Sequence, residues 1–146
     1  MACIQSGGIY ALINVKAQNS CLDLSGGDNY SIIGYGYHSG PNQAWMFERQ
    51  YNGNYLIRSI GSGLYLNIEG EPRDGARVVA KPTQFQWHIE DEPSFQQAIR
   101  LFVPGTNQNV DLSDHGNATP GTPVTLWGKW NGNNQLWRIE SVGGVR

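Results

Sequence analysis

Short runs of alternating apolar and polar residues recur along the chain and are bounded by Gly, Asn and Pro. Three of these runs are IYALINV at 9–15, YLIRSI at 55–60 and AIRLFV at 98–103. Because alternate residues of a strand face opposite sides, a period of two over runs this short predicts β-strands. The segment FQQAIRLF at 95–102 could form a helical turn in isolation, but its place in the recurring pattern favours a strand.

A polar motif after these runs also recurs. Three segments share an apolar residue, a polar centre and a second apolar residue in one frame: CLDLSGGD at 21–28, LYLNIEGE at 64–71 and NVDLSDHG at 109–116. Their polar centres are Asp23, Asn67 and Asp111, and each follows the previous one by 44 residues. A fixed period of this length indicates an internal repeat, here in three copies.

Each copy closes with a tryptophan that is followed two places later by an apolar residue, at Trp45, Trp87 and Trp137. Their presence in every copy predicts core positions. About four short strands per copy make twelve, and units too small to bury a core alone must share one. The sequence therefore predicts one all-β domain over 1–146 with pseudo-threefold symmetry. Its repeats are approximately 8–49, 50–92 and 93–142.

The triplicated Asp-Leu start, the Gly-rich loop and the Asn-Gln-x-Trp close (NQAW at 42–45, NQLW at 134–137) resemble the ricin-B-type lectins over essentially the whole chain. The resemblance implies a β-trefoil, which is a six-stranded barrel capped by three hairpins. Residues 23–45 are similar to the first repeat of small fungal (mushroom) lectins of that family. It implies a non-enzymatic lectin for terminal galactose or N-acetylgalactosamine on glycoproteins or glycolipids, and a homodimer that agglutinates cells.

Composition and charge narrow the partner. The 146 residues include 19 Gly and 5 Trp but only 15% charged residues, as expected for many short strands joined by turns. The net charge is −2 and no basic run is present, so neither nucleic acid nor an anionic membrane is an expected partner. The N-terminus has no secretion signal and no segment approaches a membrane span, which predicts a cytoplasmic protein that meets its glycans after release or ingestion.

No cofactor or metal is expected. His38, His88 and His115 fall in different repeats without metal-ligand spacing. Cys3 and Cys21 are the only thiols, and two cysteines in a domain with an adequate core do not make a disulfide framework.

Repeat one holds the fullest set of sugar-binding candidates. A neutral sugar offers hydroxyls and an apolar face of C–H groups, which suit a carboxylate, an amide and an aromatic ring. The resemblance implies that Asp23 and Asn42 hydrogen-bond the sugar and that His38 stacks on it. It also implies that Gln43 holds the site together and that backbone near Gly40 contacts the ligand. Further candidates are Gly26 and Tyr35.

Repeat three repeats part of this set. Asp111, Asn134, Gln135 and Trp127 match the more general family pattern, in which a Trp lies under the sugar, and predict a second site. Lys129 and Trp130 are additional residues that rim or block it. Repeat two departs from the pattern, because Asn67 replaces the acid and Phe85 stands where the Gln would be, so its site is expected to be degenerate.

Other interpretations remain at this stage. Asp23 and Asp111 could be turn residues that bond their own following backbone. A β-trefoil can also act as a protease inhibitor through an exposed loop, and a glycan array set against a protease panel separates that function from a lectin. An enzyme is disfavoured, because a glycosidase needs two carboxylates across one cleft and these two lie in different repeats.

Overall fold

The computed structural model describes residues 3–142, which form twelve strands, four in each repeat. The strands are β1 (Gly8–Asn14), β2 (Ser20–Leu24), β3 (Ile32–Gly36), β4 (Trp45–Arg49), β5 (Tyr55–Ser59), β6 (Tyr65–Ile68), β7 (Val78–Lys81), β8 (Gln86–Asp91), β9 (Ala98–Phe102), β10 (Gln108–Leu112), β11 (Thr122–Gly128) and β12 (Trp137–Ser141). The segment 95–102 contributes strand β9, as predicted.

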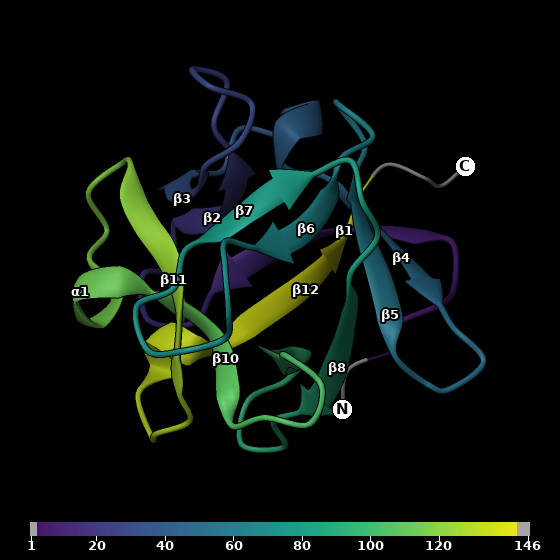
Figure 1. Cartoon of the computed structure of the whole chain (residues 1–146). Coiled ribbons are helices and arrows are strands. Elements are labelled where there is room, and N and C mark those ends of the chain that lie inside the picture. The colour runs from purple at the N-terminus through teal and green to yellow at the C-terminus, as the bar shows by residue number, and fades with distance from the viewer. Residues whose placement is uncertain (1–2, 143–146) are drawn as a thin grey trace.

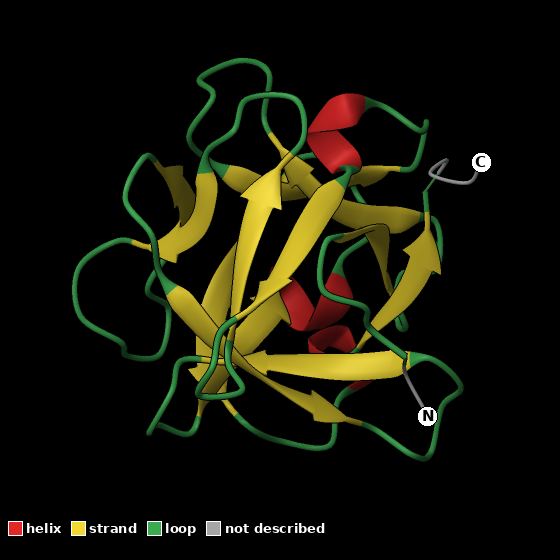
Figure 2. Cartoon of the chain, turned by 90° about the vertical axis from the view of Figure 1, so that its right-hand side faces the viewer, coloured by secondary structure: helices red, strands yellow, loops and turns green. Residues whose placement is uncertain are grey.

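Helical structure is limited to short pieces (Figure 2). Two 3₁₀ turns, η1 (Pro41–Gln43) and η2 (Asn133–Gln135), carry the Asn-Gln phrases. The four-residue α1 (Ser113–Gly116) is an irregular turn, because Asp114 and His115 have left-handed backbone angles. No helix within residues 3–142 is long and apolar enough to cross a membrane.

Six strands close into a barrel by their pairing, and the strands can be followed in Figures 1 and 2. Antiparallel pairing runs from β1 to β4, β5, β8, β9 and β12, and β12 pairs with β1 again. The other six strands form three hairpins, β2–β3, β6–β7 and β10–β11. The predicted β-trefoil is therefore confirmed.

The three hairpins are joined to one another in a cap. Strand β3 pairs with β11, and single bridges link Ser31 with Val79 and Arg77 with Thr125. Each hairpin thus borders both of the others. Loops from different repeats consequently meet, which becomes important at the candidate site.

The repeated tryptophans fill the core and tie the barrel to the hairpins. Trp45, Trp87 and Trp137 are 0% exposed, which confirms the predicted core positions. Their indole N–H groups donate to the backbone carbonyls of Leu22, Leu66 and Val110 at 3.0, 2.9 and 3.1 Å. Each acceptor directly precedes the polar centre of its repeat. Each recurring Trp therefore fixes the position of the polar centre of its repeat relative to the core.

The two cysteines are free, with Cys3 exposed and Cys21 buried. Burial, followed by the nearby Asp23 charge, raises the pKa of the Cys21 thiol to about 12. Cys21 therefore stays protonated and acts as a small apolar core residue.

Candidate functional site

Asp23 and Asp111 are strand residues, and the turn interpretation is wrong for both. Asp23 lies in β2 opposite Ile33, and Asp111 lies in β10 opposite Thr125. Their exposed fractions are only 3% and 6%. A carboxylate this deeply buried needs hydrogen-bond donors, and the Asn-Gln phrase of the same repeat supplies them.

In repeat one, both carboxylate oxygens of Asp23 accept an amide N–H. Gln43 Nε2 donates to Oδ2 at 2.8 Å, and Asn42 Nδ2 donates to Oδ1 at 3.2 Å. Asn42 Nδ2 also donates to the Leu24 carbonyl at 3.1 Å. Because each carboxylate oxygen has about two acceptor positions, Asp23 keeps capacity for two further donors.

Gln43 and Gly40 shape the site from behind. Gln43 is fully buried, donates to the Gly36 carbonyl at 2.9 Å and accepts the His38 N–H at 2.9 Å. It therefore holds the loop without reaching the surface. A Cβ on Gly40 would collide with the His38 ring and with Asn42 Oδ1, so glycine is required there for packing.

These residues border a hollow of about 310 Å³. The structure brings five of the seven predicted repeat-one residues to its wall, whereas Gly40 and Gln43 lie outside the lining. The Tyr35 ring is 43% exposed and meets the His38 ring edge-on, with 6.1 Å between centroids. The full lining is Asp23, Ser25, Gly26, Gly27, Ile33, Tyr35, His38 and Asn42.

Repeat three reproduces the three contacts of the buried Gln and the bond from the Asn side chain to a strand carbonyl. Gln135 Nε2 donates to Asp111 Oδ2 at 2.9 Å and to the Gly128 carbonyl at 3.0 Å, and its Oε1 accepts the Trp130 N–H at 3.1 Å. Asn134 Nδ2 donates to the Leu112 carbonyl at 3.0 Å. Gln135 is fully buried, like Gln43.

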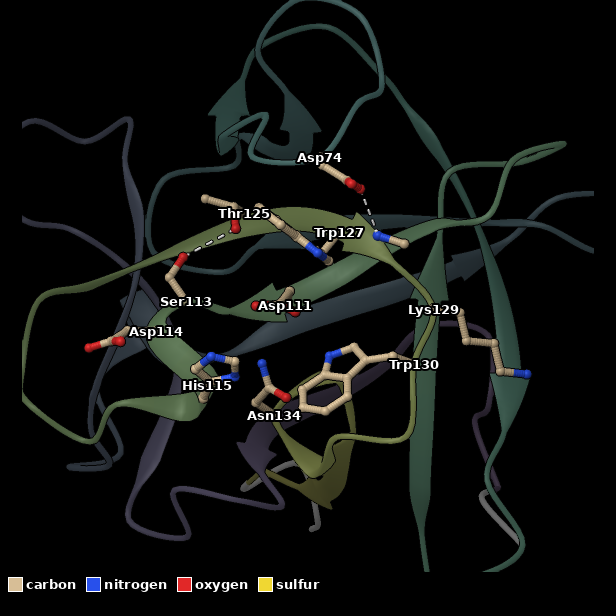
Figure 3. Close-up of a pocket in the computed structure, with 11 residues that line it drawn as sticks. Asp74, Asp111, Ser113, Asp114, His115, Thr125, Trp127, Lys129, Trp130 and Asn134 are labelled. Carbon is tan, nitrogen blue, oxygen red and sulfur yellow. Dashed lines mark hydrogen bonds between the residues drawn. The ribbon is translucent and has the colours of Figure 1, made fainter.

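The hollow of repeat three is larger, at about 540 Å³. Figure 3 shows Asp111 in the middle, with the two indole rings, His115 and Asn134 around it, whereas the Lys129 side chain extends away. Trp127 and Trp130 are 47% and 45% exposed. The lining is Asp74, Asp111, Ser113, Asp114, His115, Thr125, Trp127, Gly128, Lys129, Trp130 and Asn134.

The backbone contacts show which rings correspond between the two repeats. The Trp130 N–H reaches Gln135 as the His38 N–H reaches Gln43, so Trp130 is the counterpart of His38. Trp127 is then the counterpart of Tyr35. From the sequence, Trp130 was interpreted as an additional residue. The spacing ring-x-Gly-x-Asn-Gln, which residues 38–43 and 130–135 share, was the signal that could have identified it as the counterpart of His38.

Six of the eleven lining residues were not predicted from the sequence, and two of them, His115 and Asp74, make notable contacts. The His115 ring meets Trp130 edge-on, with 5.9 Å between centroids. Asp74 comes from the β6–β7 loop of repeat two, and its Oδ1 accepts the Gly128 N–H and Gln108 Nε2, both at 2.9 Å. Asp74 belongs to no repeated motif and reaches the hollow because the hairpins meet, whereas His115 lies in the repeated segment NVDLSDHG at 109–116 but has no counterpart ring in the other copies.

Burial sets the electrostatics of both acids. Desolvation raises the pKa of Asp23, and the Gln43 amide, the His38 charge and the Asn42 amide partly oppose it. Desolvation likewise raises the pKa of Asp111, against the Gln135 and Asn134 amides and the His115 charge. Each acid is thus held ready to accept hydrogen bonds in a partly dry site, where such bonds are strong.

Repeat two lacks this arrangement, as its sequence predicted. Asn67 Nδ2 donates to the Thr83 carbonyl at 3.1 Å, and its Oδ1 accepts the Ile68 N–H at 2.8 Å. Phe85 packs against Trp87, with 5.1 Å between ring centroids. The hydrogen-bonding groups of Asn67 are therefore used by the backbone of its own repeat.

Across residues 3–142, no group of three or more His, Cys, Asp or Glu side chains is placed to hold a metal ion. The chemistry of the two hollows is that of hydrogen-bond acceptors, amides and aromatic rings.

Fold and hollows together define a β-trefoil of the lectin type. The family described as "Ricin-type beta-trefoil lectin domain-like" matches residues 3–81 and 41–127. The chain therefore belongs to the ricin-type β-trefoil lectin family, whose members bind carbohydrate.

Solved structures agree with this assignment. The Macrolepiota procera ricin B-like lectin in complex with lactose is 50% identical, with a TM-score of 0.90, over 95% of this chain and 99% of that one. The Rhizoctonia solani agglutinin is 23% identical, with a TM-score of 0.83, over 97% and 99%. The designed threefold-symmetric protein ThreeFoil is 24% identical, with a TM-score of 0.82, over 90% and 97%. The last two show the fold alone. Comparison with curated protein sequences gives no match to this chain.

Proposed function

We propose that the chain is a lectin without catalytic activity that binds terminal galactose- or N-acetylgalactosamine-type sugars in the hollows of repeats one and three. The observation that carries the proposal is the buried acid–amide pair beside exposed rings, Asp23 with Asn42 and Asp111 with Asn134. The lactose complex of the 50% identical Macrolepiota lectin supports the sugar class, because lactose ends in galactose.

The polar pair suits adjacent sugar hydroxyls. Asp23 retains acceptor capacity after bonding Asn42 and Gln43, so two hydroxyls can donate to one carboxylate in charge-assisted bonds. Asn42 contributes an amide oxygen that lies beside the hollow. The ring of His38 or Tyr35 covers the apolar C–H face of the sugar.

Repeat three offers the same polar pair with larger rings. Trp130 replaces His38 and Trp127 replaces Tyr35, which gives more apolar surface for a sugar face. The prediction that repeat one is the principal site stays a prediction. Both hollows supply the required groups.

Calorimetric titration with lactose tests the proposal, with maltose as the glucose-type control sugar. Two lactose sites per wild-type chain are expected, one after Asp23→Ala or Asp111→Ala, and none after both substitutions. Loss of a buried charge-assisted contact weakens a site about ten- to hundredfold. Unchanged lactose binding by the double variant contradicts the assignment of both hollows.

The absence of catalysis is part of this proposal and is supported by the surroundings of the acids. Glycoside hydrolysis uses two carboxylates that flank one bond, and Asp23 is the single carboxylate among the residues that line the repeat-one hollow. Three carboxylates line the repeat-three hollow, but Asp74 Oδ1 accepts the Gly128 N–H and Asp114 Oδ2 accepts Asn117 Nδ2. Asp23 and Asp111 are held by the amides of their own repeats. Incubation with lactose should therefore leave the disaccharide intact.

For action on cell surfaces we further propose a homodimer whose interface avoids residues 23–42. A single-sugar site binds weakly, and linking several sites raises avidity by about 10² to 10⁴. Sedimentation should give the mass of two chains, and the protein should agglutinate cells. A monomer that still agglutinates would reject the dimer and require both hollows of one chain to bind.

A further inference from the structure

Arg100 is a buried cation on a barrel strand, in a position that is apolar in the other repeats. In the strand pairing, Ile99 lies opposite Trp137 as Tyr10 lies opposite Trp45 and Tyr55 opposite Trp87. The residues that follow are Ala11, Leu56 and Arg100. Arg100 is only 5% exposed. Burial of a guanidinium is expensive unless its donors are used, so its contacts explain its presence.

The Arg100 guanidinium reaches the back of the repeat-three hollow. Nη1 donates to Gln135 Oε1 at 2.9 Å and to Asn109 Oδ1 at 3.2 Å, and Nη2 donates to the Trp130 carbonyl at 3.0 Å. Asn109 Nδ2 in turn donates to the Trp127 carbonyl at 2.9 Å. Arg100 and Asn109 together therefore bind the backbone of both residues whose indoles wall the hollow.

The charge of Arg100 is balanced from the opposite side. Its Nε lies 3.7 Å from Glu92 Oε1. Burial lowers the Arg100 pKa, whereas the charges of Glu92 and Glu90 raise it. An arginine keeps its proton under such opposing effects, so all contacts to the hollow come from a cation.

Repeat one shows what the site looks like without this pair. Ala11 stands in place of Arg100 and Cys21 in place of Asn109, and the two pack with Ile13 in a small apolar cluster. There the side chain of Gln43 holds the loop 35–38 through the Gly36 carbonyl and the His38 N–H, and no arginine or asparagine adds to it from the positions of Arg100 and Asn109. Gln135 makes the same two bonds in repeat three.

Arg100 and Asn109 add two more anchors to the equivalent loop of repeat three. The segment 127–130 is thus held at the carbonyls of Trp127, Gly128 and Trp130 and at the Trp130 N–H. Anchors of this kind order a binding segment before the ligand arrives, which lowers the entropy lost on binding.

We infer that Arg100, together with Asn109, is a positioning pair that pre-orders the segment carrying Trp127 and Trp130 for sugar binding in repeat three. The inference rests on the proposed function, since it requires that this hollow binds galactose-type sugars. Neither residue lines the hollow, so both act through the residues that do.

The decisive variant is the double substitution Arg100→Ala with Asn109→Cys, which installs the pair that repeat one already packs. Arg100→Lys is a second variant that keeps the charge but has a single nitrogen for the three acceptors. Leu101→Ala is the matched control, because Leu101 is the next buried residue of β9, belongs to the main core and has no polar side-chain atom that could join the hydrogen bonds of this network.

The test uses the full chain labelled with 5-fluorotryptophan, with Trp127 and Trp130 fluorine resonances assigned by single Trp→Phe variants and followed during a lactose titration. We expect saturating shifts in the wild type, and at least tenfold weaker binding at these indoles in the double variant. Arg100→Lys should be intermediate. Lactose binding in repeat one, followed at the His38 ring resonances, should be unchanged in all of them. Leu101→Ala should lower the melting temperature but leave the lactose response of both indoles unchanged.

The outcomes separate the two ideas. If the wild-type indoles respond and the double variant binds with the same affinity, the positioning role is overturned while the sugar site stands. The same applies if Leu101→Ala weakens binding as much as the double variant, because loss of stability then explains both. If the wild-type indoles show no response while His38 does, the repeat-three sugar site is rejected, and the binding role of Arg100 with it.

Discussion

Replacement of Asp23 by Asn tests the chemistry of the repeat-one hollow with almost no change of shape. Asp23 accepts one amide N–H on each carboxylate oxygen, from Asn42 and from Gln43. An amide at this position has a single oxygen, so it cannot satisfy both donors and also accept two sugar hydroxyls. Repeat two already carries the same change at Asn67.

The expected loss can be worked from these contacts. One charge-assisted hydrogen bond is worth about 1.5–3 kcal/mol, which corresponds to a lactose affinity about ten- to hundredfold lower. The free energy of unfolding should stay within about 1 kcal/mol of the wild type. The lost amide contacts are offset because the variant no longer buries the charge whose desolvation raises the Asp23 pKa.

The assay is a lactose titration in an Asp111→Ala background, so that only the repeat-one hollow contributes. Asp91→Asn is the control, because it removes one charge from the end of barrel strand β8 and lies outside both hollows. The control should bind lactose normally. An Asp23→Asn variant with lactose affinity within twofold of its parent would refute the role of the carboxylate.

Three further outcomes are expected. His38→Ala should weaken lactose binding in repeat one with little change in melting temperature. Trp45→Ala should destabilise the fold by about 3–5 kcal/mol, because Trp45 is fully buried. If the His38→Ala variant binds lactose normally, Tyr35 is the stacking residue instead. Gly40→Ala should weaken lactose binding, since its Cβ would displace the His38 ring, whereas Gly36→Ala has open space and should not; equal titrations would contradict this packing argument. Repeat-one lactose affinity should fall as pH is lowered through the raised Asp23 pKa. The stability contributed by protonated Asp23 is present below the ordinary Asp pKa and lost as pH rises through the raised one. Titrations and thermal melts across the acidic range measure both. Asp23→Asn should remove the pH dependence of repeat-one affinity and the Asp23 part of the stability change, while Asp111, whose pKa is also raised, keeps its own part.

Much of the fold was predictable because it is encoded in regular spacings along the sequence. Two-residue alternation identified strands such as β1 and β9, and the 44-residue spacing of the polar centres identified three units. The recurring Trp at the end of each unit had to be core, since it persists in repeat two, where the polar set does not. Repeats with these features have to share one core with each other, and the closure of six strands into a barrel follows.

The polar members of the candidate site were also predictable, because each hollow uses an acid and an Asn-Gln phrase from one repeat. Residues 23 and 42 are brought together by the hairpin that separates them in sequence. What each residue does was less accessible. The resemblance already implied that Gln43 holds the site together, and Gln43 is fully buried behind the hollow. The implied backbone contact near Gly40 stays a prediction, and the structure adds that a Cβ there would collide with the His38 ring.

The tertiary structure alone decided how the surroundings of the two hollows differ. The match of Trp130 to His38, the reach of Asp74 from repeat two and the use of buried Arg100 behind the repeat-three hollow all depend on which segments meet in the cap and barrel. Such contacts join residues that are distant along the chain and follow no period. The sequence by itself thus determined the repeat, its core and its polar sets, since these are encoded in local spacing. The path of the chain in space determined the walls and supports of each hollow, since those come from neighbouring strands and repeats.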